Sequence, residues 1–254
     1  MDAEPKDGMV KVPAVTLGFW IIKILATTLG ETAGDTVSMS MDLGYLVGTA
    51  IFIVPLILFV AFQIRARRFH PALYWATIIA STTAGTTMAD FATRSLSIGY
   101  TGGSALLLAC VLLSLALWRA VMGSVAVDTV SSTKSEVFYW VTITFSQTLG
   151  TALGDWAADD GGLGYLGGAA LFGAALLVLL ALWRFTAASR VVLFWAAFIL
   201  TRPLGATVGD FLDKPLAKGG LDFSRPVASA VLVTAIILLI VFVPQRAHQG
   251  ARGH

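Results

Sequence analysis

The chain contains little charge for its length. Only 13% of its 254 residues are charged, whereas 57% are hydrophobic, and the mean hydropathy is +0.81. Soluble domains carry about 25% charged residues, so this composition excludes a soluble globular protein and indicates an integral membrane protein. No polar segment is long enough for a separate soluble domain, and we expect a single membrane domain over residues 1–254.

Cysteine and histidine are also scarce. Cys110 is the only cysteine, which excludes an internal disulfide or a thiolate metal cluster, and the three histidines fall in expected loops or in the tail. The formal charge of +2 is too small to indicate a nucleic-acid partner. Because no nucleophile–base pair and no phosphate-binding loop appears, we expect neither an enzyme nor a cofactor. The N-terminus lacks the order of a signal peptide, so the first apolar segment is expected to stay in the mature protein.

Four stretches of the chain align with one another without a gap. They are "FWIIKILATTLGETAGD", "YWATIIASTTAGTTMAD", "YWVTITFSQTLGTALGD" and "FWAAFILTRPLGATVGD". In each, a Trp precedes an Asp by fifteen positions: Trp20 and Asp35, Trp75 and Asp90, Trp140 and Asp155, Trp195 and Asp210. This regularity predicts four copies of one structural unit.

A second apolar run follows each aligned stretch. Ten residues after the Asp stands Tyr45, Tyr100 or Tyr165, whereas the fourth copy has Gly220 there, in a longer and more charged connector. We predict an all-α membrane protein of eight transmembrane helices, two per repeat, with repeats over residues 11–66, 67–121, 135–186 and 189–245 and a linker over residues 122–134. Because each repeat has an even number of spans, all four copies point the same way.

The basic residues outside the expected spans predict the orientation. The termini and the loops between repeats hold eleven, against four in the loops within repeats, namely Arg94, Lys214, Lys218 and Arg225. Basic loops stay in the cytoplasm, so we expect a multi-pass protein of a bacterial inner membrane with both termini cytoplasmic. The Trp residues would then anchor the helices at the inner interface.

One face of each aligned stretch is expected to avoid lipid. The positions three, seven, eleven and fifteen after Trp are four apart, so they share one side of a helix, which we call the stripe. The stripes are Lys23, Thr27, Glu31 and Asp35; Ile78, Thr82, Thr86 and Asp90; Ile143, Gln147, Thr151 and Asp155; and Phe198, Arg202, Ala206 and Asp210. Since charges in hydrocarbon are costly, we expect the four stripes to meet around a shared interior.

A Gly-x-x-x-small pattern runs beside each stripe, beginning at Gly30, Gly85, Gly150 and Gly205. Small residues let helix backbones approach closely. The first helix of every repeat should therefore lie inside the bundle, and the second helix, which is apolar all round, should lie outside.

The predicted interior is rich in carboxylates. Glu31, Asp35, Asp90, Asp155 and Asp210 face Lys23 and Arg202, an excess of three negative charges. Oxygen ligands of this kind suit protons or a hard cation such as Mg²⁺, Mn²⁺ or Ca²⁺. We expect these five acids to bind ion and proton, with Glu31, Asp35 and Asp155 holding a metal. Glu31 should pair with Lys23 or Arg202, because an unpaired buried charge is costly. The supporting polar residues would be Lys23, Thr27, Thr82, Thr86, Gln147, Thr151 and Arg202.

These motifs resemble those of a bacterial family of membrane-anchored proteins built from a tandem repeat of unknown function, with a Thr-Leu-Gly-x-x-x-Gly-Asp core. The likeness extends from about Lys11 to Pro244, through "TTLGETAGD", "TTAGTTMAD", "QTLGTALGD" and "RPLGATVGD". A looser likeness is to cation/proton exchangers with a Glu-x-Gly-Asp motif. Here "ETAGDT" supplies Glu31, Gly34, Asp35 and Thr36, with one residue more than that motif and no basic residue after Asp.

The sequence favours a secondary transporter that moves a small cation, such as a divalent metal, in exchange for protons. Its partners would be the lipid bilayer, the cation and protons, and a homo-oligomer is compatible with the pattern. Two other functions stay open. One is a non-transporting membrane sensor or scaffold, in which the stripes form interhelical hydrogen bonds and the Asp residues end helices. The other is a carrier of a small organic anion, which would use Lys23 and Arg202.

Overall fold

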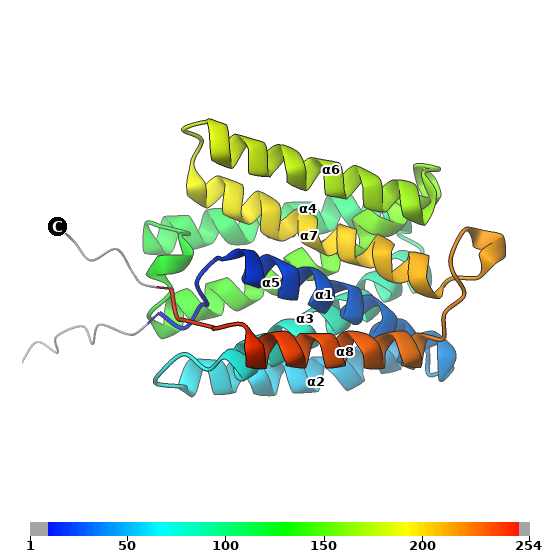
Figure 1. Ribbon diagram of the computed structural model, residues 1–254, viewed down its shortest axis with the longest axis horizontal. Helices are drawn as coiled ribbons and strands as arrows, with labels where there is room; N and C mark the ends of the chain where they lie inside the picture. The colour runs from blue at the N-terminus through cyan, green and yellow to red at the C-terminus, as the bar shows by residue number, and fades with distance from the viewer. Residues whose placement is uncertain (1–9, 249–254) are drawn as a thin grey trace, which may run out of the picture.

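The computed structural model describes residues 10–248, which form eight long helices running along one axis (Figure 1). They are α1 (Leu17–Asp35), α2 (Gly44–Arg65), α3 (Pro71–Asp90), α4 (Gly99–Met122), α5 (Thr133–Asp155), α6 (Gly164–Phe185), α7 (Arg190–Asp213) and α8 (Arg225–Phe242). The predicted all-α class is confirmed. Five of these helices, α2, α4, α6, α7 and α8, are long and apolar enough to cross a membrane. Lys6 and Arg252, two of the residues used to predict orientation, lie outside the described residues, as does His254.

The odd-numbered helices form the inside of the bundle and the even-numbered helices the outside, as predicted. In α5, for example, 15 of 23 residues are buried, whereas α2 buries only Gly48, Leu56 and Gln63 of its 22. The reason is the distribution of polar groups. The inner helices carry the stripes and must bury them, and the outer helices are apolar on every side.

The four inner helices form a closed ring. In this ring α1 contacts α3 and α7, and α5 contacts the same two helices, so α1 and α5 lie opposite each other. Each outer helix packs mainly on the inner helix of the following repeat: α2 on α3, α4 on α5 and α6 on α7. The last helix, α8, packs on α1 and completes the circle, and the two ends of the described chain meet in a bridge between Pro13 and Ala247.

The first glycine of each Gly-x-x-x-small pattern determines how closely the ring helices approach. A Cβ atom at Gly30, Gly150 or Gly205 would collide with the second stripe residue of the next helix in the ring, and one at Gly85 would lie in tight contact with it. The pairs are Gly30 with Thr82, Gly85 with Gln147, Gly150 with Arg202, and Gly205 with Thr27. Small residues and stripe residues therefore share one interface, instead of occupying separate faces as the sequence suggested.

At the end of the bundle that carries the motif Asp residues, three repeats share one turn and the fourth differs. There α1, α3 and α5 pass into short π-helical turns, η1 (Thr36–Ser40), η2 (Phe91–Ser95) and η4 (Trp156–Asp160). The chain then reverses through Gly44, Gly99 and Gly164, each in a left-handed conformation that glycine adopts at little cost. In contrast, α7 continues to Asp213, and its connector contains the short helix η5 (Leu216–Lys218). We call this end the acidic end.

The opposite end is closed by aromatic side chains. Trp75, Trp140 and Trp195 are at most 4% exposed, so the prediction that the motif Trp residues act as interface anchors is wrong for these three. The aromatic residue before each Trp contacts the Trp of a neighbouring repeat instead. The centroid distances are 5.5 Å for Phe19 and Trp75, 5.7 Å for Tyr74 and Trp140, 6.2 Å for Tyr139 and Trp195, and 5.9 Å for Phe194 and Trp20. We call this ring the aromatic collar.

Candidate functional site

The four stripes meet along the centre of the inner ring, as predicted, and none of their residues is more than 3% exposed. They stack in layers between the aromatic collar and the acidic end. The layer next to the collar is apolar except for Lys23, and the layer at the acidic end consists of the four motif Asp residues. Between them lie a layer with Gln147 and Arg202 and a layer with Glu31. The polar groups are thus concentrated in the half of the axis that is nearer the acidic end.

Two bases bridge the four motif aspartates in pairs. The Nε of Arg94 lies 3.0 Å from Asp90, and its Nη2 lies 3.3 Å from Asp155. The Nζ of Lys214 lies 2.5 Å from Asp35 and 2.8 Å from Asp210. Both bases were predicted to lie in loops, and their bridging role was not predicted. The available signal was their spacing, because each base stands four residues after a motif Asp and so returns to the same helix face.

Arg94 is held by more than its two carboxylates. Its Nη1 donates a hydrogen bond to the hydroxyl of Tyr45 over 3.3 Å, and its guanidinium lies 5.8 and 5.7 Å from the ring centroids of Tyr45 and Tyr100. Arginine suits such a site, because its planar group can pair with two carboxylates and contact aromatic rings together. Two of the three tyrosines that recur ten residues after the Asp thus contact a base that bridges the aspartates.

Lys214 follows α7 directly and is 8% exposed. Burial lowers the pKa of Lys214, but the attraction of Asp210, Asp35 and Asp213 outweighs burial and holds it well above its ordinary value. Lys214 is therefore an ammonium ion at neutral pH. Nearby, Arg225 pairs with Asp213 over 2.9 Å.

Glu31 lies one helical turn deeper than the aspartates. Arg202 Nη2 donates to Glu31 Oε2 over 2.9 Å and to the hydroxyl of Thr86 over 2.7 Å, and it also bonds the hydroxyl of Thr151. Of the two bases that we expected to pair with Glu31, Arg202 does so. Lys23 does not pair with it. Its Nζ lies 3.8 Å from the ring centroid of Phe198 and makes no hydrogen bond with any described residue.

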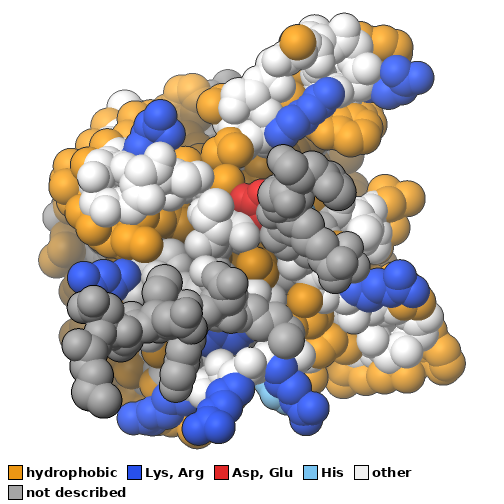
Figure 2. Space-filling model, turned by 90° about the vertical axis from the view of Figure 1, so that its left-hand side faces the viewer, with side chains coloured by type: hydrophobic (Ala, Val, Ile, Leu, Met, Phe, Trp, Pro, Cys, Tyr) orange, Lys and Arg blue, Asp and Glu red, His pale blue; other side chains and the backbone are white. Residues whose placement is uncertain are grey.

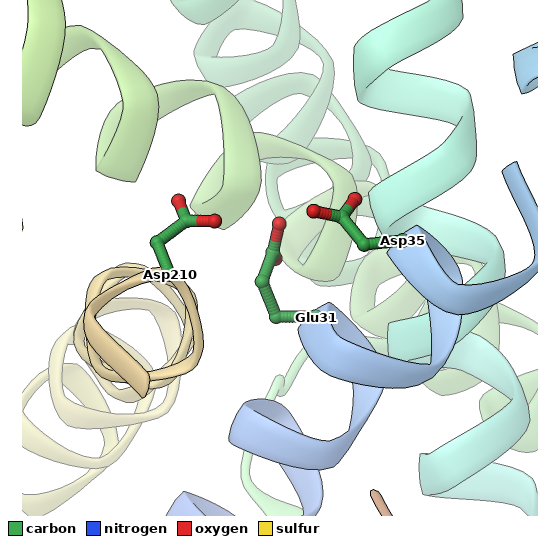
Figure 3. A group of neighbouring side chains, drawn as sticks. All are labelled: Glu31, Asp35 and Asp210. Atoms are coloured by element: carbon green, nitrogen blue, oxygen red, sulfur yellow. The ribbon is translucent and has the colours of Figure 1, made fainter. Parts of the chain in front are cut away.

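Three carboxylates converge between α1 and α7. Glu31, Asp35 and Asp210 point toward one another (Figure 3), and each offers an oxygen within 4.8 Å of the other two. The predicted metal set contained Asp155, whereas the structure brings Asp210 together with Glu31 and Asp35. The reason is the order of the ring. α7 lies beside α1, whereas α5, which carries Asp155, lies across the axis. We call Glu31, Asp35 and Asp210 the α1–α7 cluster.

The charge of the interior also differs from the expectation. Arg94 and Lys214 join Lys23 and Arg202, so the five acids face four bases and the formal excess is one negative charge instead of three. The axis as a whole therefore carries little net charge.

The remaining predicted polar residues are buried within the interior. Thr27 donates to the carbonyl of Thr201 over 3.2 Å, and Thr86 donates to that of Gly30 over 3.0 Å. The side-chain polar atoms of Thr82 and Gln147 make no hydrogen bond with described residues.

Hollows of about 610 and 250 Å³ lie on the outer face of α8 and beside Pro244, away from the axis.

The fold and the site together define a helical protein built from four repeats, with several membrane-type helices around a charged interior. The family described as Repeat of Unknown Function (DUF347) matches residues 18–69, 73–124, 138–189 and 193–246, and the chain belongs to this family. The resemblance to a tandem-repeat family is thereby confirmed. No curated protein and no solved structure matched the chain. The likeness to cation/proton exchangers stays a prediction.

Proposed function

We propose that the protein is a secondary transporter that exchanges a small cation for protons along the axis of the inner ring. The observation that carries this proposal is the α1–α7 cluster, in which Glu31, Asp35 and Asp210 bring three carboxylates together while they are at most 2% exposed. Such groups are expensive to bury, and within membranes they usually mark ion or proton pathways. Carboxylate oxygens can hold a hard cation or protons in turn, which is the chemistry of exchange.

In this proposal all eight helices cross a bacterial inner membrane. The helices α1, α3 and α5 are less apolar than the other five because of their stripes, but these stripes face the axis and not the lipid. Both termini would be cytoplasmic. Basic side chains surround the end of the bundle where the described chain begins and ends (Figure 2), which agrees with the preference of Lys and Arg for the cytoplasmic side.

The α1–α7 cluster would load from the acidic end. There the bridging bases reach the surface, with the side chain of Arg94 31% exposed and that of Lys214 10% exposed. Toward the aromatic collar the axis is filled by Ile78, Ile143 and Phe198, which are fully buried. Release on the other side would therefore require the inner helices to separate at the collar.

The two other candidate functions differ in their support. An organic-anion carrier would need Lys23 and Arg202 free of Glu31, and the contact between Arg202 and Glu31 argues against it. A sensor or scaffold agrees with the filled axis near the collar. It gives no reason for a third carboxylate at Glu31, where the other repeats have Thr86, Thr151 and Ala206.

The test is proton movement driven by a cation gradient in reconstituted vesicles. Glu31→Gln keeps the size of the side chain and removes a charge and a proton site. We expect this variant to lose Mn²⁺-driven proton movement while it stays folded, and Asp128→Asn in the linker to retain the wild-type rate. Wild-type rates in well-folded Glu31→Gln would refute the proposal and favour the scaffold.

A further inference from the structure

The ammonium group of Lys214 lies against the outer side of the α1–α7 cluster. It contacts Asp35 Oδ2 at 2.5 Å and Asp210 Oδ1 at 2.8 Å, and Asp213 is 4.0 Å away. The backbone of Lys214 is fixed on both sides, because its N–H donates to the carbonyl of Asp210 and its carbonyl accepts from Asp222. Only the side chain is therefore free to leave the carboxylates.

The cluster has further capacity for a positive partner. Asp35 is fully buried, and its Oδ1 accepts no hydrogen bond from any described residue, although Oδ2 is paired with Lys214. A buried carboxylate oxygen without a donor is unfavourable unless a cation or a proton compensates it. Asp35 therefore supplies a ligand atom that Lys214 does not use.

We propose that Lys214 occupies the place of a divalent cation, which displaces its side chain on binding to Glu31, Asp35 and Asp210. This inference rests on the proposed function and names its substrate class. Three carboxylates with Arg202 carry two formal negative charges. Lys214 neutralises one of them, and a monovalent ion would do no more. A divalent ion neutralises both, and the all-oxygen donor set suits Mg²⁺, Mn²⁺ or Ca²⁺.

The other side of the axis shows why displacement is expected at Lys214 and not at Arg94. Arg94 also bridges two aspartates, but it is bound to the Tyr45 hydroxyl and lies beside two rings. A single metal ion cannot reproduce the planar contacts of the Arg94 guanidinium. The Lys214 ammonium is a compact charge, so a metal ion can take its place. In addition, a third carboxylate, Glu31, joins Asp35 and Asp210, whereas Thr86 and Thr151 stand at the equivalent positions of the second and third repeats.

The experiment is Mn²⁺ binding to the purified full chain in detergent, measured by electron paramagnetic resonance. Without the competing ammonium, Lys214→Gln should bind Mn²⁺ about tenfold more tightly than the wild type. The matched control is Lys218→Gln, which removes an exposed lysine of the same connector and should leave the dissociation constant unchanged. An unchanged or weaker affinity in Lys214→Gln, or no Mn²⁺ binding to either protein, would overturn the inference.

A second measurement on the wild-type protein covers the case that Lys214→Gln does not fold. Saturating Mn²⁺ should increase acylation of Lys214 by acetic anhydride severalfold, as read by mass spectrometry, while Lys218 labelling stays constant. Equal labelling of Lys214 with and without Mn²⁺ would show that the ammonium is not displaced. The failure of the proposed function would look different, because Mn²⁺ would then bind and displace Lys214 without driving protons across vesicles.

Discussion

The acidic end has two halves that are built alike but do not offer the same chemistry. On one side Arg94 joins the aspartates of the second and third repeats, and on the other Lys214 joins those of the fourth and first. Both bases stand four residues after a motif Asp. The bases belong to the second and fourth repeats, so they follow a two-fold relation around the ring.

The difference between the halves lies in the neighbours of each base. In the Arg94 half, Tyr45 accepts a hydrogen bond from the guanidinium, and the rings of Tyr45 and Tyr100 lie beside it. The Lys214 half adds a third carboxylate, Glu31, together with its partner Arg202, so each half keeps one formal negative charge. The halves therefore differ in the number of carboxylates that converge and in the contacts that hold the bridging base. Under the proposed function, the Arg94 half stabilises the fold and the Lys214 half exchanges the cation.

The largest expected effect compares one aspartate from each half. In vesicles, Asp35→Asn should reduce Mn²⁺-driven proton movement at least about 100-fold, because it removes a ligand and a proton site from the cluster. Asp90→Asn should keep the rate within about threefold of wild type, because the proposed cation site does not include Asp90. Equal losses of proton movement in the two variants would contradict the claim that only the Lys214 half takes part in exchange.

The next effect concerns packing in the ring. A Cβ on Gly205 would overlap the side chain and backbone of Thr27 between α7 and α1, whereas one on Gly85 would lie 3.0 Å from backbone atoms of Gln147 and Thr148. We expect Gly205→Ala to destabilise the protein by about 3 kcal/mol and Gly85→Ala by about 1 kcal/mol. The measurement is unfolding in detergent, with Gly173→Ala, which has open space, as the control. A Gly85→Ala variant less stable than Gly205→Ala contradicts this order.

A smaller effect should follow from exchanging the base of the Arg94 half. Arg94→Lys keeps the charge but loses the planar contacts to two carboxylates and to Tyr45. We expect a loss of about 1–2 kcal/mol in unfolding free energy. Arg119→Lys, at the opposite end and more exposed, is the matched control and should change stability by less than about 0.5 kcal/mol. If Arg94→Lys is as stable as the control, the planar contacts of Arg94 do not stabilise its half of the acidic end.

The smallest effect concerns a base that belongs to neither half. Lys23 is fully buried beside Phe198 and makes no hydrogen bond with described residues. Lys23→Met fills a similar volume without a polar group, so it should raise the unfolding free energy by about 1 kcal/mol. A clear loss of stability in this variant would mean that Lys23 makes a polar contact that stabilises the fold.

Much of the architecture could be predicted from the sequence. Polar residues four positions apart in each motif predicted that one helix face carries the stripe. Because charge in lipid is costly, this face was predicted to lie inside, and the burial of all four stripes confirms it. The apolar surface of the second helices placed them outside for the same reason. These conclusions needed only the properties of single helices.

The partners within the site could not be predicted in the same way. Four similar helices can close a ring in more than one order, and only the observed order brings Asp210, and not Asp155, beside Glu31. Lys214 and Arg94 were assigned to loops because the motif helices were expected to end at the Asp. In the structure, helical geometry continues past the motif Asp, in α7 and in the π-helical turn η2. A base four residues after the Asp therefore still reaches the aspartates.

The most direct test of the central claim is the stoichiometry of Mn²⁺ binding in Asp210→Asn and Asp155→Asn, two variants that alter equivalent residues of different halves. Purified in detergent and titrated under electron paramagnetic resonance, the wild-type chain should bind one Mn²⁺. Asp155→Asn should retain this binding, and Asp210→Asn should lose it. Loss of binding in Asp155→Asn with retention in Asp210→Asn, or no difference between the two, would contradict the assignment of the cation to the α1–α7 cluster.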